Sequence, residues 1–85
     1  MYEIYWDDEA LKDLKNLDKT IARKIVIKIQ NYLKQDPENL GKLLNRQFKN
    51  LYRYRMGDYR VIYEIYRQEV HINVVKIGHR KDVYK

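Results

Sequence analysis

Hydrophobic and polar positions follow different repeats in the two halves of the chain. Between residues 10 and 33, apolar residues recur at spacings of three and four, which is the repeat of amphipathic helices. Between residues 48 and 77, aromatic and β-branched residues alternate with polar ones, which is the repeat of strands with one buried face. The pattern therefore predicts helices followed by strands.

Two helices are predicted in the first half, after a short strand at residues 2–6. Asp7–Glu9 favour a helix start, because acids match the helix dipole and can cap free N–H groups. That helix runs to about Leu17. Asp18 suits the cap of a longer helix that ends near Lys34, ahead of Pro37. The apolar stripe of this second helix consists of Ile21, Ala22, Ile25, Val26, Ile29, Tyr32 and Leu33.

Three strands are predicted in the second half, over residues 48–56, 58–66 and 69–77, after a polar connection at 36–46. Gly57-Asp58 is a tight-turn signal, and Arg67-Gln68 is a weaker one. Helices followed by hairpins indicate an α+β fold of order β-α-α-β-β-β. In this fold, two N-terminal helices pack on one face of a small, mainly antiparallel sheet. At 85 residues, we expect a single domain, 1–85.

Alternation assigns the strand residues to two faces of the sheet. The helix-facing side is predicted to contain Tyr59, Val61, Tyr63 and Ile65 of the middle strand and Val70, Ile72 and Val74 of the last. The opposite side collects Arg53, Arg55 and Arg60. Neighbouring like charges repel, so three guanidinium groups on one face are costly unless they bind an anion. The pattern therefore indicates a platform for a polyanionic partner.

The distribution of charge supports a polyanionic partner. The net charge is +6; residues 1–41 carry 7 basic and 8 acidic side chains, whereas residues 42–85 carry 11 and 4. A basic half of this kind is typical of proteins that bind phosphate. The chain has no cysteine, two histidines and no metal-spaced cluster, so we expect no metal or other cofactor. Without a signal-peptide pattern or an apolar span, we expect a soluble cytoplasmic protein with no membrane partner.

Three segments together carry a family resemblance: ALKDLKNL in the first helix, the hairpin YRYRMGDYRVIYEI, and the closing IGHRKDVY. With them the chain resembles the RelE toxins of the RelE/ParE superfamily, the toxic halves of bacterial and archaeal toxin–antitoxin pairs. The resemblance covers nearly the whole chain. It implies a RelE-like fold and a small ribosome-dependent endoribonuclease that inhibits translation by cutting mRNA in the A site. It also implies a cognate antitoxin that holds the toxin inactive.

The family's functional positions fall on Arg53, Arg55, Arg60, Arg80 and Tyr84 of this chain. The implied reaction is attack of an RNA 2′-hydroxyl on the neighbouring phosphate, which builds up negative charge on phosphorus. Arginine stabilises such charge well, because its planar fork matches phosphate oxygens and stays protonated. Arg60 and Arg80 are assigned this role. Arg53 and Arg55 are assigned further contacts to the RNA backbone.

Proton transfer needs a different residue, because arginine is a poor general base at neutral pH. His79 is the chemically natural candidate, since it titrates near neutrality and adjoins Arg80. Tyr84 can stack on a displaced base, or transfer a proton if nearby cations lower its pKa. Lys81, in the same basic cluster, is predicted to contact RNA.

Simpler explanations exist for the same arginines. Arg53 and Arg55 also fit ordinary edge-strand charges that discourage aggregation. Arg60 also fits an ion pair with Asp58 or Glu64 that stabilises the sheet. Two other functions stay open as well: a ParE-like toxin that poisons DNA gyrase without ribonuclease activity, and a binding module that docks RNA without cutting it.

The expected partners are the ribosome with its mRNA and an acidic antitoxin. The antitoxin would neutralise the arginines or wrap the helix pair, where Ile27 lies opposite the apolar stripe of the second helix. Operator DNA is expected to be bound only by the toxin–antitoxin complex, because the DNA-reading part belongs to the antitoxin.

Overall fold

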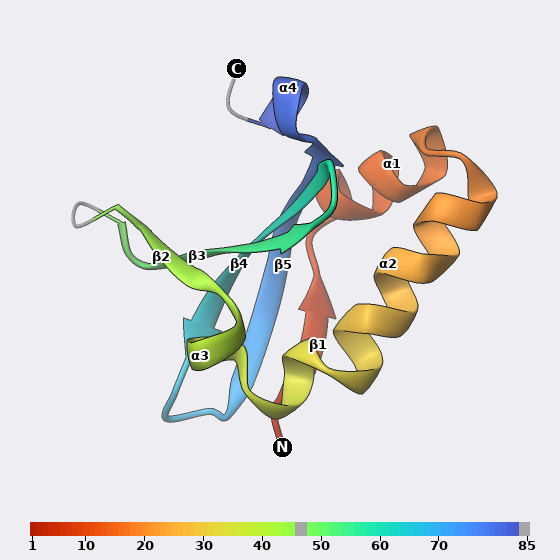
Figure 1. The fold of residues 1–85 in the computed structure, drawn as a ribbon. Helices are drawn as coiled ribbons and strands as arrows, with labels where there is room; N and C mark the ends of the chain where they lie inside the picture. The colour runs from red at the N-terminus through yellow and green to blue at the C-terminus, as the bar shows by residue number, and fades with distance from the viewer. Residues whose placement is uncertain (46–47, 84–85) are drawn as a thin grey trace.

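The structure, a computed structural model, describes residues 1–45 and 48–83. The two longest helices lie on one side of a twisted sheet, which confirms the α+β class (Figure 1). The helical elements are α1 (Asp8–Asn16), α2 (Lys19–Asn31), the 3₁₀ helix η1 (Leu33–Gln35), α3 (Pro37–Leu40) and α4 (Arg80–Val83). The strands are β1 (Glu3–Trp6), β2 (Lys42–Asn45), β3 (Phe48–Met56), β4 (Tyr59–Tyr66) and β5 (His71–His79).

The sheet has the strand order β1-β5-β4-β3-β2. Strands β2 to β5 follow one another as antiparallel neighbours, as consecutive hairpins require. Strand β1 is the exception, because it pairs in parallel with β5, with Glu3 opposite His71 and Trp6 opposite Val74. The predicted, mainly antiparallel sheet is confirmed, and the parallel pair joins the first and last strands.

The predicted connection at residues 36–46 is wrong in part, because it contains α3 and β2. Pro37 is the first residue of α3, a position where its missing N–H costs nothing. Leu43 then pairs with Tyr52 of β3. A four-residue strand is too short to show an alternating pattern, and pairing with β3 stabilises it instead. The second helix also ends earlier than predicted, at Asn31, where η1 takes over.

Three further predictions at the ends of elements are corrected. Val70 is 45% exposed and has a φ of 52°, because it lies in the turn before β5 and not in the core. Tyr32 is 53% exposed and lies under the ammonium group of Lys28, outside the predicted apolar stripe. Strand β5 continues past Ile77 to His79, and α4 follows it.

The core lies between the helices and one face of β3, β4 and β5. Its buried members are Ala10, Ile25, Ile29, Leu33, Tyr52, Val61, Tyr63, Ile65, Ile72, Val74 and Ile77. The predicted cap of the second helix is confirmed, because the Asp18 carboxylate accepts from the N–H groups of Thr20 (3.0 Å) and Ile21 (3.4 Å). Helix α1 borders β5 beyond the end of β1, where Ile77 N–H donates to the Asp13 carboxylate (2.9 Å).

A buried tyrosine fixes the segment that leads into β2. The Tyr63 hydroxyl donates to the Pro37 carbonyl at 2.5 Å, and Gly41 passes so close that a Cβ there would overlap this hydroxyl. Burial raises the pKa of Tyr63. The start of β2 is thereby held to the middle of the sheet. Within the described residues, no helix has the length and apolar character needed to cross a membrane.

Candidate nucleic-acid interface

The strand register places basic side chains in two rows on the face opposite the helices. In one row, Lys42 pairs with Arg53, and Arg53 pairs with Ile62 of β4. In the next row, Arg55 pairs directly with Arg60. Residues opposite each other in an antiparallel pair project on the same side. The structure therefore brings Arg53, Arg55 and Arg60 together as predicted, and we call them, with Lys42, the cationic face.

Arg60 is the most deeply buried member of the cationic face, at 6% exposure. One terminal guanidinium nitrogen donates to the carbonyl groups of Gly57 (2.8 Å) and Tyr59 (3.0 Å). Within the described residues, Arg60 forms no ion pair with Asp58 or Glu64. Its charge therefore lies at the β3–β4 turn, compensated by backbone dipoles and not by a carboxylate.

Arg80 reaches the same turn from the adjacent end of β5. Its backbone N–H donates to the Asp58 carbonyl (2.7 Å), and its Nε lies 3.8 Å from the Asp58 carboxylate. The Arg80 side chain is 56% exposed. Arg60 and Arg80, which are 20 positions apart, thus both contact residues of one hairpin turn.

A glycine allows the last helix to pack close to Arg60. Gly78 pairs with Arg60, and a Cβ on Gly78 would lie 3.1 Å from Cγ2 of Val83. Val83 is buried, so α4 folds back against the end of β5. Tyr84, the predicted closing aromatic of the site, lies outside the described residues, and its role stays a prediction.

The structure separates His79 from the cationic face. The register between β4 and β5 shifts near Val75, where β5 has one extra residue, and such a bulge reverses the face on which later residues project. His79 consequently pairs with Tyr59, and its ring contacts the Tyr59 ring edge on the helix side (5.6 Å between centroids). Its Nδ1 accepts from the Lys81 N–H at 3.2 Å.

The contact with Lys81 gives His79 a local structural task at the start of α4. A proton on Nδ1 would abolish this hydrogen bond. Lys81 itself is exposed on α4. The roles assigned to these two residues stay predictions, and for His79 the geometry favours helix capping over contact with a ligand on the arginine side.

Lys42 is a basic residue that the sequence did not single out. A small cleft of about 100 Å³ is lined by Leu40, Lys42, Arg53 and Arg55. The pattern around Lys42 predicts a connection, which has no face to assign, so alternation does not place this lysine with the arginines. The available signal was the short run Lys-Leu-Leu directly after Gly41.

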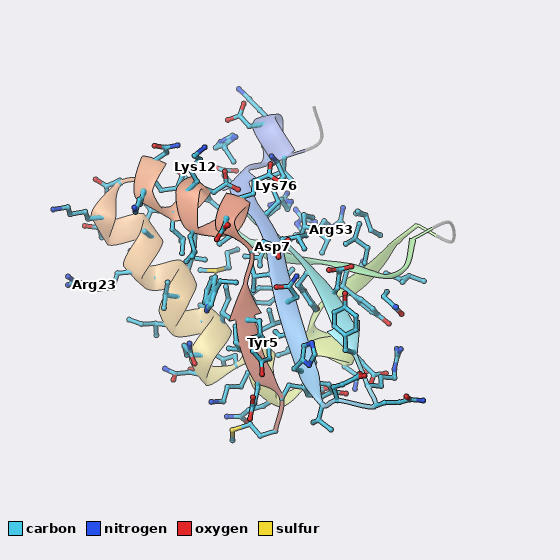
Figure 2. The ribbon with its side chains drawn as sticks, turned by 180° about the vertical axis from the view of Figure 1, so that it is seen from behind. Tyr5, Asp7, Lys12, Arg23, Arg53 and Lys76 are labelled. Atoms are coloured by element: carbon cyan, nitrogen blue, oxygen red, sulfur yellow. The ribbon has the colours of Figure 1, made fainter. Side chains whose placement is uncertain are left out.

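Towards β1, the same face of the sheet carries carboxylates and aromatic rings in place of the arginines. There the Asn73 side chain donates to the carboxylates of Asp7 (2.9 Å) and Glu64 (3.3 Å). The rings of Tyr5, His71 and Tyr66 cluster beside them. Figure 2 shows Tyr5 of β1 and Arg53 on opposite sides of β5. Carboxylates repel phosphate, so a bound polyanion would stay on the part of the face formed by Lys42, Arg53, Arg55 and Arg60.

Comparison with known proteins agrees with this architecture. A family described as "ParE toxin of type II toxin-antitoxin system, parDE" matches residues 4–84. The toxin RelE of Mycobacterium tuberculosis is 31% identical over 84 residues, covering 99% of this chain and 87% of that protein. The toxin RelG of the same organism is 27% identical over 84 residues, covering 99% of this chain and 97% of RelG.

A solved structure shares the fold. The toxin–antitoxin complex RelBE2 from Mycobacterium tuberculosis contains a chain that matches with a TM-score of 0.87 and 26% identity, covering 93% of this chain and 98% of that one. The family match spans nearly all of the sequence, and one relative exceeds 30% identity over almost the whole chain. The chain therefore belongs to the RelE/ParE superfamily and is a RelE-like toxin of a type II toxin–antitoxin system.

Proposed function

We propose that this toxin inhibits translation as a ribosome-dependent, metal-independent endoribonuclease that cuts mRNA in the A site. The observation that carries the proposal is the direct pairing of Arg55 with Arg60 beside Arg53 on one open face of the sheet. Such a concentration of fixed positive charge suits a phosphate backbone. The similarity to the toxins named RelE and RelG supports the proposed function as well.

The proposed chemistry is an internal transfer at one phosphate. The 2′-oxygen forms a bond to phosphorus and loses its proton, while the bond from phosphorus to the 5′-oxygen breaks and that oxygen gains a proton. The products are a 2′,3′-cyclic phosphate and a free 5′-hydroxyl. Negative charge grows on the phosphate oxygens in the transition state, and nearby guanidinium groups stabilise it. One such preorganised donor is commonly worth about 10²–10³ in rate.

The arginines differ in how they can serve this reaction. Arg55 is exposed and can meet a phosphate directly, with the two-pronged geometry that guanidinium groups favour. Arg60 already donates from one terminal nitrogen to two carbonyl groups, so it contributes its charge and its remaining N–H donors. Arg80 contributes from the far side of the same turn, where its side chain is 56% exposed.

Proton transfer is the step for which the described residues offer least. His79 lies on the helix side and accepts from a backbone N–H, and the placement of Tyr84 is not described. We therefore propose that the ribosome orients the RNA and helps with proton movement. Free RNA should then be a poor substrate, whereas mRNA on programmed ribosomes should be cut.

A cognate antitoxin is the proposed inhibitor. The matching RelBE2 structure is itself a toxin–antitoxin complex. An acidic antitoxin segment would complement the cationic face, and Ile27, which is 48% exposed on α2, offers an apolar contact on the helix side. Operator DNA would be bound only through the antitoxin in the complex.

The proposal is tested by inducing the gene and mapping mRNA ends. We expect new 5′ ends within codons during growth arrest, and cleavage of ribosome-bound mRNA at an unchanged rate by toxin that has been treated with EDTA and desalted before it is added to the ribosomes. Arg55→Ala and Arg80→Ala should each reduce cleavage, whereas Lys12→Ala on α1 removes the same charge far from the cationic face and serves as the control. Growth arrest with uncut messages would overturn the proposal.

A second candidate is inhibition of DNA gyrase, because the matching family description names the ParE toxin. This activity needs no ribonuclease site. A supercoiling assay with purified gyrase separates the two functions. Inhibition by wild type that persists in Arg55→Ala, without any mRNA cleavage, would favour the gyrase function.

A further inference from the structure

Lys42 extends the cationic face to the edge of the sheet. It is the first residue of β2, the outermost strand, and it pairs with Arg53 of β3. Two cations in directly opposed positions destabilise a strand pair. Within the part of the chain that the structure describes, no acidic side chain forms an ion pair with Lys42. Lys42 therefore brings to this strand pair a positive charge that no ion pair of its own compensates within the described residues.

The sheet geometry sets how far Lys42 lies from the centre of the proposed reaction. Neighbouring strands are about 4.8 Å apart, and residues i and i+2 of a strand are about 6.7 Å apart. Lys42 pairs with Arg53, Arg55 lies two residues further along β3, and Arg60 pairs with Arg55 on β4. The Cα atoms of Lys42 and Arg60 are therefore separated by two strand spacings and one two-residue step, or about 12 Å. Side chains stand roughly perpendicular to a sheet. Lys42 and Arg60 are thus placed to meet different phosphates.

The cleft beside Lys42 gives the second phosphate a defined place. Lys42, Arg53 and Arg55 line it together with Leu40, which is 45% exposed. Two kinds of surface meet there: cations that suit a phosphate, and an apolar side chain that suits the face of a sugar or base. The opposite direction along the sheet leads to the carboxylates of Asp7 and Glu64, which repel RNA.

From this geometry we propose that Lys42 is a substrate-binding residue that holds a second RNA phosphate, distinct from the one being cut. The RNA would run across the strands, from the β3–β4 turn towards the β2 edge. The inference rests on the proposed ribonuclease function. It adds a fourth cation to the three arginines, with a role in positioning the RNA and none in the bond-making step.

An edge lysine also has a purely structural use, because a charge on an edge strand discourages pairing with other chains. The two roles differ in what they predict. Protection of the edge affects solubility and is independent of RNA. A phosphate contact affects the affinity for RNA and its dependence on salt.

The test compares wild type with Lys42→Ala, Lys42→Arg and the control Lys12→Ala. Cleavage of mRNA on programmed ribosomes is followed by single-turnover kinetics at several toxin and salt concentrations. For Lys42→Ala we expect an apparent affinity about tenfold weaker, with a maximal rate within about twofold of wild type. The salt dependence should lose about 0.7 from its logarithmic slope, the value for one phosphate contact on single-stranded RNA.

The variants also define how the inference fails. Lys42→Arg should retain wild-type affinity and slope, since it keeps the charge, and Lys12→Ala should match wild type. If Lys42→Ala keeps the affinity and salt slope of a wild type that cuts normally, the role of Lys42 is overturned and the ribonuclease function stands. If wild type cuts no message at all, the proposed function itself falls.

Discussion

Replacing Arg60 with alanine tests how one buried cation serves both the fold and the proposed reaction. The guanidinium group donates to the Gly57 and Tyr59 carbonyls while the residue is only 6% exposed. Hydrogen bonds from charged donors are worth about 1.5–3 kcal/mol each when made to buried partners. Water can reach the carbonyls of this turn once the side chain is gone. We therefore expect a total loss of about 2–3 kcal/mol of unfolding free energy.

Such a loss is large but need not unfold the protein. A domain of this size has a stability on the order of 5 kcal/mol, and 1 kcal/mol corresponds to about 4–8 °C in Tm. Arg60→Ala should therefore melt about 10–20 °C below wild type. It should also cut ribosome-bound mRNA more slowly by about 10²-fold or more. Loss of toxicity in this variant thus has two sources, and they must be separated.

Arg55→Ala is the matched control, because Arg55 pairs with Arg60, projects on the same face and is exposed. It removes the same charge without the bonds to the turn, so its stability should stay within about 0.5 kcal/mol of wild type. Urea unfolding followed by the fluorescence of Trp6 measures both variants. Equal urea midpoints for Arg60→Ala and Arg55→Ala would refute the stabilising role of the buried guanidinium group.

Two further predictions concern the buried tyrosine. Gly41→Ala places a methyl group against the Tyr63 hydroxyl and should lower the free energy of unfolding by about 1–3 kcal/mol, measured as a lower Tm. A combined Gly41→Ala/Tyr63→Phe variant should recover part of this loss. No recovery would argue against the overlap. Burial raises the pKa of Tyr63 above its ordinary value of about 10, so the folded state holds a proton that the unfolded chain releases. Stability should therefore be complete below about pH 10 and fall as the pH rises above it, and Tyr63→Phe should flatten that decline in urea midpoints measured from about pH 8 to 11.

The alternating strands and their faces were predictable because their pattern is local. Nine residues of β3 and eight of β4 repeat with period two, on either side of a glycine turn. Strand β2 could not be predicted in the same way. It has four residues, and it forms because β3 supplies its hydrogen-bonding partners across the hairpin.

The candidate site was predictable where strand parity is preserved. Arg53 and Arg55 are two residues apart on β3, and Arg60 follows on β4 after one tight turn. Alternation along the two strands therefore predicts that all three side chains share one face, as found. Alternation does not hold along the whole of β5. The extra residue near Val75 reverses the face on which later side chains project, so His79 lies on the helix side. The burial of Arg60 was also beyond the sequence, since it accompanies hydrogen bonds from the guanidinium group back to the Gly57 and Tyr59 carbonyls.

The parallel pairing of β1 with β5 imposes an order of events on synthesis in the cell. Residues 3–6 leave the ribosome first, yet their partners, residues 71–74, are made almost seventy positions later. Until then β5, the strand between β1 and β4, is missing. Arg80, which follows β5, has also not yet bonded to the β3–β4 turn. Contacts between segments so distant in the chain also form slowly. The complete sheet, and the contact of Arg80 with its hairpin turn, can therefore form only after residues 71–80 have been made.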